Sequence, residues 1–291
     1  MTLGILDWGI GGVAFYAAFK ARFPEVGVVY LSDAGCPPYG CLNAGELEAR
    51  LAVVAPRLAR AGVTRLVVAC NAMSTVLPRH SAAGLGFEQV CGVIDSAVKA
   101  VLEADVGVVG VVAGAHTVRS GAYARPLRTA GLIVRQRVAQ PLSALVEAGR
   151  VGSPEFRAET KRVMAPLGRV DALVLGCTHY WAGVARFAEL TRGTVIVDPA
   201  RETLERVVVG WFDDRPARDQ GREAEGARPK IAAADTFLAT GDPVAMARVA
   251  RLAFGVTLPP VTGVGPDLRA SRARRPPPRR PIGTRRSRPV G

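Results

Sequence analysis

Short apolar runs alternate with amphipathic stretches along most of the chain. The apolar runs are rich in valine, isoleucine and leucine and end at polar or glycine-containing turns, which is typical of strands covered by helices on both faces. Eight segments are predicted as strands: Leu3–Leu6, Val26–Leu31, Arg65–Ala69, Gln89–Val93, Val106–Val112, Ile133–Val138, Ala172–Leu175 and Thr194–Val197. Strands that alternate with helices predict an α/β fold with mainly parallel sheets.

The clearest helical stretches are Glu46–Ala61 and Ser153–Leu167. Ser153 is a suitable N-cap for the second of them. We also expect a closing helix over Asp235–Gly255 and a surface loop or hairpin over the charged segment 213–230. Ligands in α/β folds bind beyond the carboxyl ends of the strands, so the polar residues that follow the predicted strands are the first candidates for a site.

The composition predicts a chain large enough for two domains, with 291 residues of which 49% are hydrophobic. No apolar run is long enough to span a membrane. The first residues do not show a basic segment followed by a long apolar stretch and a cleavage site, so we expect no secretory signal. The five cysteines are an odd number in apolar surroundings, which favours a reduced cytoplasmic protein over a disulfide scaffold.

The formal net charge of +13 is concentrated towards the end of the chain. Residues 268–291 hold nine arginines, five prolines and no acidic residue. Such a segment cannot bury enough apolar surface to offset its ordering entropy, so we expect a disordered basic tail over 265–291. A solvated tail and a weak contact with nucleic acid or another polyanion both fit this composition. No aromatic residue lies among the arginines, so base stacking has no support.

A glycine-rich loop follows the first predicted strand. Gly9-Ile10-Gly11-Gly12-Val13-Ala14 satisfies the dinucleotide-binding pattern G-x-G-x-x-G/A, and Asp33 ends the next strand, where a ribose-binding acid would lie. Against a phosphate site, Asp7 would place negative charge beside the pyrophosphate, and Trp8 would crowd the backbone. A tight structural turn also explains the glycines. From this loop alone, a nucleotide site and a structural turn both stay open.

Two cysteines after two predicted strands give a more specific signal. Cys70 follows Arg65–Ala69, and Cys177 follows Ala172–Leu175. A metal site is disfavoured because the chain has no Cys-x-x-Cys pair and only three histidines. A Cys/His hydrolase would need only one of the thiols. Two thiols that face one pocket from opposite sides suit general acid–base catalysis, in which one thiolate removes a proton from carbon and the other thiol returns a proton to the opposite face.

Seven motifs stand in one order along residues 3–257. They are Asp7-Trp8-Gly9-Ile10-Gly11-Gly12, Ser32-Asp33 with Pro38-Tyr39-Gly40, Val68-Ala69-Cys70-Asn71, Thr117-Val118-Arg119-Ser120-Gly121-Ala122-Tyr123, Leu145-Val146-Glu147-Ala148-Gly149, Leu175-Gly176-Cys177-Thr178-His179-Tyr180 and Val197-Asp198-Pro199-Ala200. Together they resemble the bacterial glutamate racemases, a family within the aspartate/glutamate racemase superfamily. The resemblance disfavours a dinucleotide site.

The resemblance implies two pseudo-symmetric, three-layer α/β domains with mainly parallel sheets and an active site in the cleft between them. The first domain would comprise residues 1–93 and 207–264, and the second residues 94–206. The implied activity is a cofactor-independent, metal-free interconversion of L- and D-glutamate in the cytoplasm, supplying D-glutamate for peptidoglycan. The implied partner is a small-molecule amino-acid substrate. No membrane association is implied, and a homodimer is compatible with the family.

The resemblance also implies roles for individual residues. Cys70 would take the α-proton from the D-isomer with the help of Asp7. Cys177 would take it from the L-isomer with the help of His179, and Glu147 would lie near this second thiol. The substrate-binding residues implied by the family are Trp8, Pro38, Tyr39, Gly40, Asn71, Ala72, Thr117 and Thr178. Among these, Asn71 and Thr178 would hold the α-carboxylate, and Tyr39 and Gly40 the side-chain carboxylate.

Four positions depart from the family pattern: Trp8 replaces a serine, Ala72 and Gly114 replace threonines, and Trp181 replaces a proline. Three of these changes remove a hydroxyl expected near the substrate, and each hydrogen bond to a charged group is worth about 1.5–3 kcal/mol. The Trp8 indole either turns away into the packing or reshapes the pocket. The alternatives are therefore a different small amino or dicarboxylic acid substrate, little racemase activity, or polyanion binding by the tail.

Residues outside the motifs are given structural interpretations. Cys36, Cys41 and Cys91 are interpreted as ordinary thiols, because nothing in the sequence pairs with them. His116 is a weaker candidate for the pocket, since it lies beside Thr117 but has no identifiable partner.

Overall fold

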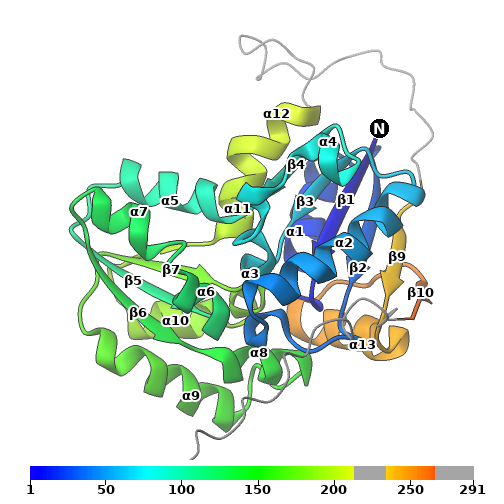
Figure 1. Ribbon diagram of the computed structural model, residues 1–291. Coiled ribbons are helices and arrows are strands. Elements are labelled where there is room, and N and C mark those ends of the chain that lie inside the picture. The colour runs from blue at the N-terminus through cyan, green and yellow to red at the C-terminus, as the bar shows by residue number, and fades with distance from the viewer. Residues whose placement is uncertain (213–233, 266–291) are drawn as a thin grey trace, which may run out of the picture.

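The computed structural model describes residues 1–212 and 234–265, and these residues form two parallel sheets (Figure 1). The first sheet has the strand order β10-β9-β2-β1-β3-β4, and the second has the order β6-β5-β7-β8. The strands of the first sheet are β1 (Thr2–Asp7), β2 (Gly27–Ser32), β3 (Arg65–Val68), β4 (Gln89–Gly92), β9 (Thr236–Ala239) and β10 (Val261–Gly263). Those of the second are β5 (Val108–Ala113), β6 (Ile133–Val138), β7 (Ala172–Gly176) and β8 (Val195–Val197).

Helices cover both faces of each sheet, which confirms the predicted α/β fold class. The α-helices are α1 (Val13–Arg22), α2 (Ala44–Arg60), α3 (Asn71–Ser74), α4 (Ala82–Leu85), α5 (Ile94–Glu103), α6 (Ala115–Ser120), α7 (Ala124–Thr129), α8 (Gln140–Glu147), α9 (Pro154–Met164), α10 (Val184–Leu190), α11 (Pro199–Thr203), α12 (Val209–Phe212) and α13 (Pro243–Phe254). Shorter turns are η1 (Tyr39–Cys41), η2 (Leu77–Arg79), η3 (Ala165–Leu167), η4 (Thr178–Gly183) and the π-helical η5 (Leu204–Val208). We call each sheet with its helices a lobe, the first lobe containing β1 and the second β5.

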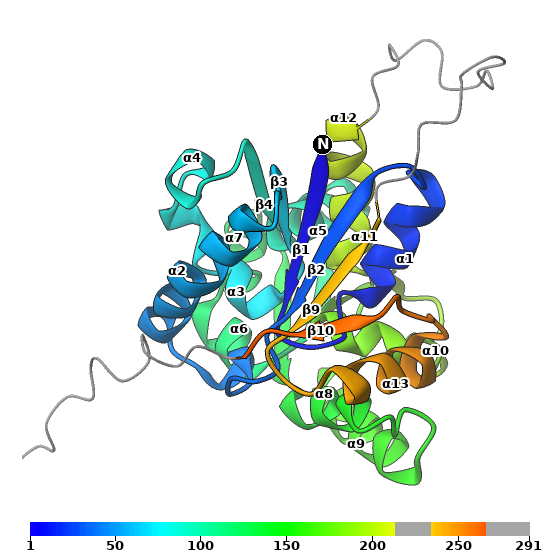
Figure 2. The same cartoon turned by 90° about the vertical axis from the view of Figure 1, so that its right-hand side faces the viewer.

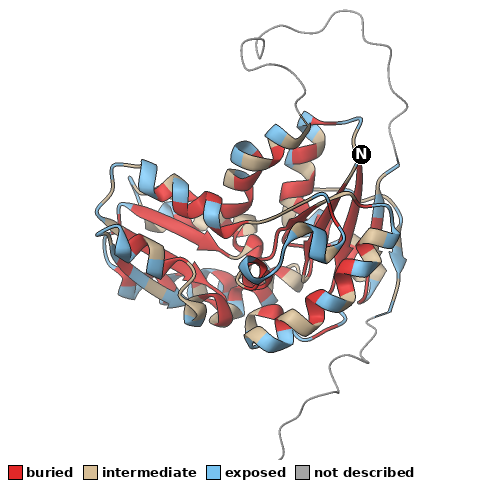
Figure 3. Cartoon of the chain, turned by 45° about the horizontal axis from the view of Figure 1, so that its top comes forward, coloured by how far each residue is buried: buried red, intermediate tan, exposed pale blue. Residues whose placement is uncertain are grey.

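Residues of β1 alternate between two cores, as the period of a strand requires. Leu3 and Ile5 pack in one cluster with α1 residues such as Phe19, whereas Leu6 packs in another with α2 residues such as Leu51. Figure 2 shows α1 and α2 on opposite sides of this sheet. The first of these clusters continues into the second lobe, so one apolar core joins the two sheets. Buried residues accordingly run along the strands and the inner helix faces (Figure 3).

All eight predicted strands form, and none of their ends shifts by more than two residues. The helix predicted from Glu46 begins at Ala44, because Asn43 and Glu46 form a capping box. Ser153 caps α9 as predicted, its hydroxyl accepting from the Phe156 amide. The domain boundaries at 93/94 and 206/207 are compatible with the strands that each sheet contains, and stay a prediction.

The prediction of one helix over Asp235–Gly255 is wrong in its first part. Thr236–Ala239 is the strand β9, which pairs in parallel with β2, and α13 begins only at Pro243. Asp242 accepts from two amides at the start of this helix. The three-residue strand β10, which pairs in parallel with β9, is a further element that the sequence pattern does not predict. The predicted loop at 213–230 and the arginine-rich tail at 268–291 lie outside the described residues.

A buried ion pair fixes the loop between β2 and α2. The Asp33 carboxylate accepts from Nε and Nη2 of Arg50, both at 2.5 Å, and both side chains are buried. It also accepts from the Tyr39 hydroxyl at 2.5 Å and from the Thr240 hydroxyl at 2.9 Å. Four hydrogen bonds therefore occupy this carboxylate. The alternative interpretation of Asp33 as a ribose-binding acid is wrong, because the group is enclosed and already bonded.

Replacing Arg50 with methionine leaves the buried Asp33 charge without its cationic partner. We expect Arg50→Met to lower the free energy of unfolding by about 3–5 kcal/mol, the usual cost of breaking a buried pair. Arg79→Met removes the cation from the exposed pair with Glu48 and is the matched control, with an expected effect of about 0–1 kcal/mol. Urea unfolding of both variants measures the difference, and equal losses would show that the buried pair has no special weight.

Candidate active site

The carboxyl ends of three strands from both lobes meet at one pocket. Asp7 is the last residue of β1, Cys70 lies just beyond β3, and Cys177 directly follows β7. The pocket is lined by Asp7, Trp8, Pro38, Tyr39, Gly40, Cys70, Asn71, Ala72, Gly114, Thr117, Gln140, Ser143, Gly176, Cys177, Thr178 and His179. Of the catalytic and substrate-binding residues that the family resemblance implies, Glu147 alone is outside this set, and its carboxylate bonds to Nε2 of His179.

The pocket is nearly filled by the side chains that line it. Its volume is about 30 Å³, which is room for only one or two water molecules. An amino acid is larger than this, so the structure represents a closed arrangement. Substrate entry therefore requires the lobes to separate or the lining side chains to rotate.

A chain of three polar side chains leads from one thiol into the interface between the lobes. His179 Nε2 lies 2.6 Å from Oε1 of Glu147, and His179 Nδ1 lies 3.7 Å from the Cys177 sulfur. Burial alone lowers the pKa of His179, but its hydrogen bonds to Cys177 and Glu147 outweigh burial and hold this pKa well above its ordinary value. The pKa of Glu147 is lowered despite burial, because its carboxylate is bonded to His179. A charged imidazole can donate to both neighbours.

The second thiol has a different environment. Cys70 is buried, and burial together with the nearby Asp7 carboxylate raises its pKa well above the ordinary value. Amides at the start of α3, those of Met73 and Ala72, act in the opposite direction but do not outweigh burial. Cys70 is therefore a neutral thiol in this closed arrangement, suited to donate a proton, and positive charge brought close to it would favour the thiolate.

Asp7 links the first lobe to the second. Its carboxylate accepts from the Trp8 amide at 2.7 Å and from the Thr178 hydroxyl at 2.9 Å. The carboxyl group is fully buried, which raises its pKa. Since Thr178 gives its only hydroxyl proton to Asp7, it can accept from a ligand but cannot donate to one in this arrangement.

Asn71 offers a donor that the protein does not use. Its side-chain oxygen accepts from the Tyr123 hydroxyl at 2.5 Å, whereas its buried Nδ2 has no partner among the described residues. An unpaired buried donor is costly unless a ligand completes it. Asn71 is thus suited to hold an anionic group such as a carboxylate. Tyr39, by contrast, donates its hydroxyl proton to Asp33 and cannot donate it to a ligand in this arrangement.

The glycine-rich loop after β1 is a contact between the lobes. A Cβ on Gly9 would lie 1.8 Å from Oε1 of Glu147, and one on Gly11 would lie 2.2 Å from the Thr178 hydroxyl. The Ile10 amide donates to Glu147 at 2.9 Å. Side chains of the second lobe therefore occupy the space that a bound pyrophosphate would need in a nucleotide-binding loop, which explains the glycines without a phosphate.

The Trp8 indole is both packed and part of the pocket wall. Its Nε1 donates to the Cys36 carbonyl at 2.9 Å, and its ring contacts the apolar cluster beneath α2. The same ring lies 6.1 Å from the His179 ring, measured between centroids. The indole is therefore both held by packing and part of the pocket wall.

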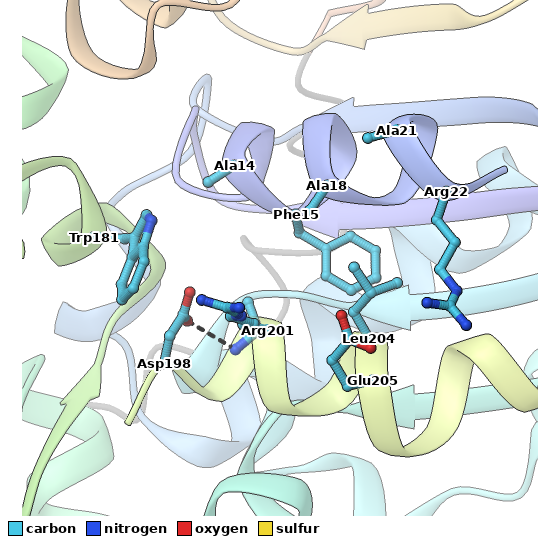
Figure 4. A pocket seen from close by; sticks show the side chains of 11 residues that line it. Ala14, Phe15, Ala18, Ala21, Arg22, Trp181, Asp198, Arg201, Leu204 and Glu205 are labelled. Carbon is cyan, nitrogen blue, oxygen red and sulfur yellow. Dashed lines mark hydrogen bonds between the residues drawn. The ribbon is translucent and has the colours of Figure 1, made fainter. Parts of the chain in front are cut away.

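Three residues that the sequence singled out, Ala72, His116 and Trp181, lie in three different places. Ala72 lines the pocket, as proposed. His116 is buried outside the lining, with Nε2 2.9 Å from the Thr75 hydroxyl. Trp181 lines a separate, open cavity of about 580 Å³ between α1 and α11, together with Arg22, Asp198, Arg201 and others (Figure 4). Neither thiol of the pair lines that larger cavity.

Gln140 and Ser143 line the pocket but carry no motif that the sequence analysis could recognise. Both are on α8, and Gln140 Nε2 donates to the Ser143 hydroxyl oxygen at 3.2 Å. The one available signal was a polar pair at i and i+3 on a helix whose other residues, apart from Glu147 at its end, are apolar. Among the described residues, no group of three or more histidine, cysteine, aspartate or glutamate side chains could hold a metal ion. No helix in the same part of the chain combines the length and apolarity needed to cross a bilayer.

Comparison with known proteins places this site in a family. The model of the Asp/Glu/Hydantoin racemase family matches residues 4–207, which include strands of both sheets and both thiols. The chain belongs to this family. Relatives include the glutamate racemase of Deinococcus radiodurans, 34% identical over 71% of this chain and 76% of the relative, and that of Mycobacterium leprae, 31% identical over 94% and 98%.

Solved structures of family members share the fold. The glutamate racemase of Thermus thermophilus in complex with β-chloro-D-alanine is 27% identical, with a TM-score of 0.74 over 91% of this chain and 96% of that one. The glutamate racemase of Francisella tularensis, 21% identical, has a TM-score of 0.76 over 91% and 98%.

Replacing the Glu147 carboxylate with a neutral group should make the protonated form of His179 less stable. In Glu147→Gln the imidazole loses its anionic neighbour, so we expect the pKa of His179, followed by NMR titration of the ring, to fall. Glu155→Gln on the exposed side of α9 is the control and should leave it unchanged. An unaltered His179 pKa in Glu147→Gln would contradict the ion pair.

The same ion pair makes stability depend on pH. Glu147 is ionised above its ordinary pKa of 4.5, and His179 is charged below its ordinary pKa of 6.5. The stability difference between the wild type and Glu147→Gln should therefore be largest between these values and shrink as pH rises through the raised pKa of His179. Urea unfolding at several pH values measures it, and a difference that keeps growing as pH rises above the ordinary pKa of His179, 6.5, would contradict the assignment.

Proposed function

We propose that this protein is a cofactor-independent amino-acid racemase that interconverts L- and D-glutamate. The observation that supports it most is the pair of thiols, Cys70 and Cys177, which reach one pocket from strands of two different sheets. The curated relatives with 31–34% identity are named glutamate racemases, which supports the choice of substrate.

The proposed reaction moves one proton out and one proton in. A thiolate takes the α-proton, so the Cα–H bond breaks, its electron pair stays on the substrate and an S–H bond forms. The opposite thiol then gives its proton to the other face of the carbon and becomes the thiolate. Cys70 would start the reaction with D-glutamate and Cys177 with L-glutamate. The oxidation state of the substrate does not change, so the step needs no electron acceptor.

The surrounding residues have assigned roles in this proposal. Charged His179, oriented by Glu147, would stabilise a thiolate at Cys177 and could give it a proton to form the thiol again. Near Cys70, the ammonium group of the substrate would offset the Asp7 charge that disfavours the thiolate. The free Asn71 amide would hold the α-carboxylate. A closed and dry pocket makes fixed donors more effective at stabilising the carbanion.

Several finer expectations belong to the same proposal. They are the two-domain division at 93/94 and 206/207, a cytoplasmic location, a homodimer, supply of D-glutamate for peptidoglycan, and a polyanion contact by residues 268–291. They rest on the family resemblance and on composition.

A change of either thiol should stop racemisation in both directions. We expect Cys70→Ser and Cys177→Ser each to lower the rate by roughly 10²–10⁴-fold, the usual contribution of a general acid or base. Optical rotation with each pure enantiomer measures it. Cys91→Ser is the control, because Cys91 is outside the pocket, and it should keep the wild-type rate. Full activity in either pocket variant would refute the proposed mechanism.

The Trp8 indole in the pocket wall favours a second candidate, a racemase for a different small acid. Trp8 narrows the pocket, so Trp8→Ser should enlarge it and raise kcat/KM for glutamate if glutamate fits poorly in the wild type. We expect an increase of about ten-fold, equivalent to about 1.4 kcal/mol. The measurement is kcat/KM for glutamate and aspartate in both proteins. A fall for glutamate would instead show that the indole is part of a pocket suited to that substrate.

A further inference from the structure

The Gln140 carboxamide occupies a gap between two glycines of opposite lobes. A Cβ on Gly40 of η1 would lie 2.2 Å from Gln140 Oε1, and a Cβ on Gly114 would lie 2.9 Å from the same atom. That second Cβ would also lie 3.5 Å from the Gly40 Cα. The threonine that the family resemblance implies at position 114 would therefore force the Gln140 carboxamide to shift. Gly114 and Gln140 complement each other, with a carboxamide in place of a hydroxyl.

Hydrogen bonds fix which way the carboxamide points. Oε1 accepts from the Ala115 amide at 3.2 Å, which only the oxygen can do. Ser143 donates its hydroxyl proton to the main-chain carbonyl of Gln140 at 2.8 Å. The Ser143 hydroxyl oxygen therefore accepts from Nε2 of the Gln140 side chain at 3.2 Å. Nε2 carries two N–H groups. Among the described residues, no acceptor takes the second one, and the Gln140 side chain lines the pocket.

We propose that Gln140 is a specificity-determining residue that reads the distal group of the substrate through this second Nε2 N–H. The proposal rests on the proposed racemase function, in which Cys70 and Cys177 mark the α-carbon and Gly40 marks the side-chain end. The carboxamide is neutral, so it recognises an oxygen acceptor rather than a charge. The substrate class is an amino acid whose side chain ends in a carboxylate or carboxamide oxygen.

Two substitutions separate the donor from the packing. Gln140→Glu keeps an oxygen for the Ala115 amide but replaces the N–H donor with a negative charge. Gln140→Met keeps the length and removes both polar atoms. Gln136→Met is the matched control, because Gln136 is half-buried on β6 and outside the pocket.

The test compares D-glutamate with D-2-aminopentanoate, which has the same chain length and no distal oxygen. In Gln140→Met we expect KM for D-glutamate to rise roughly ten-fold or more, as for the loss of a hydrogen bond to a charged group, with kcat changed less than about two-fold. Gln140→Glu should raise KM further through charge repulsion. Exchange of the α-hydrogen of D-2-aminopentanoate in D₂O should stay unchanged in both variants, and Gln136→Met should match the wild type.

Calorimetric dissociation constants for the same two amino acids keep this proposal separable from the racemase function. If the wild type binds D-glutamate without turning it over, the racemase proposal fails, and a loss of binding confined to D-glutamate in the Gln140 variants still supports the role of Gln140. An unchanged KM and dissociation constant for D-glutamate would overturn that role. An equal loss of affinity for both amino acids in the Gln140 variants would also overturn this role, and so would a wild type that binds neither amino acid.

Discussion

The close approach of the two lobes at the glycine loop is the constraint on which the site depends. Gly9 and Gly11 have no side chains, so Glu147 and Thr178 can reach the first lobe there. The Ile10 amide and the Asp7 carboxylate then form hydrogen bonds across the interface. Because β1 and β7 both present their carboxyl ends to this interface, the same contact places residues of both strands around one small volume.

This contact gives the two thiols unequal surroundings. One thiol lies beside a charged imidazole that is held by a carboxylate, and the other is buried beside a carboxylate that opposes its ionisation. A pair that exchanges one proton with a carbon needs one thiolate and one thiol at a time. A bound ammonium group would offset the negative charge of Asp7 and so favour the thiolate of Cys70.

The sequence predicted the strands and the positions of the thiols well, because both depend on local patterns. Val, Ile and Leu runs identify buried parallel strands, and Cys70 and Cys177 follow two of them. Thr236–Ala239 was mistaken for helix, since a four-residue apolar run before a helix lacks a distinct period and only its pairing with β2 makes it a strand. Gln140 was missed because its importance comes from Gly114, which is adjacent in space and distant in sequence. Likewise, pairing of Asp33 with Arg50 is a tertiary contact that no motif encodes.

The central claim is that two bases act on opposite faces of one carbon. It is tested most directly by racemisation in D₂O at early times, with the deuterium at Cα measured separately in the product and in the recovered substrate. Two thiols predict deuterium in the product while the unreacted substrate keeps its protium, from either enantiomer. Deuterium entering the substrate as fast as the product, or substrate protium carried into the product, would indicate a single base and contradict the account.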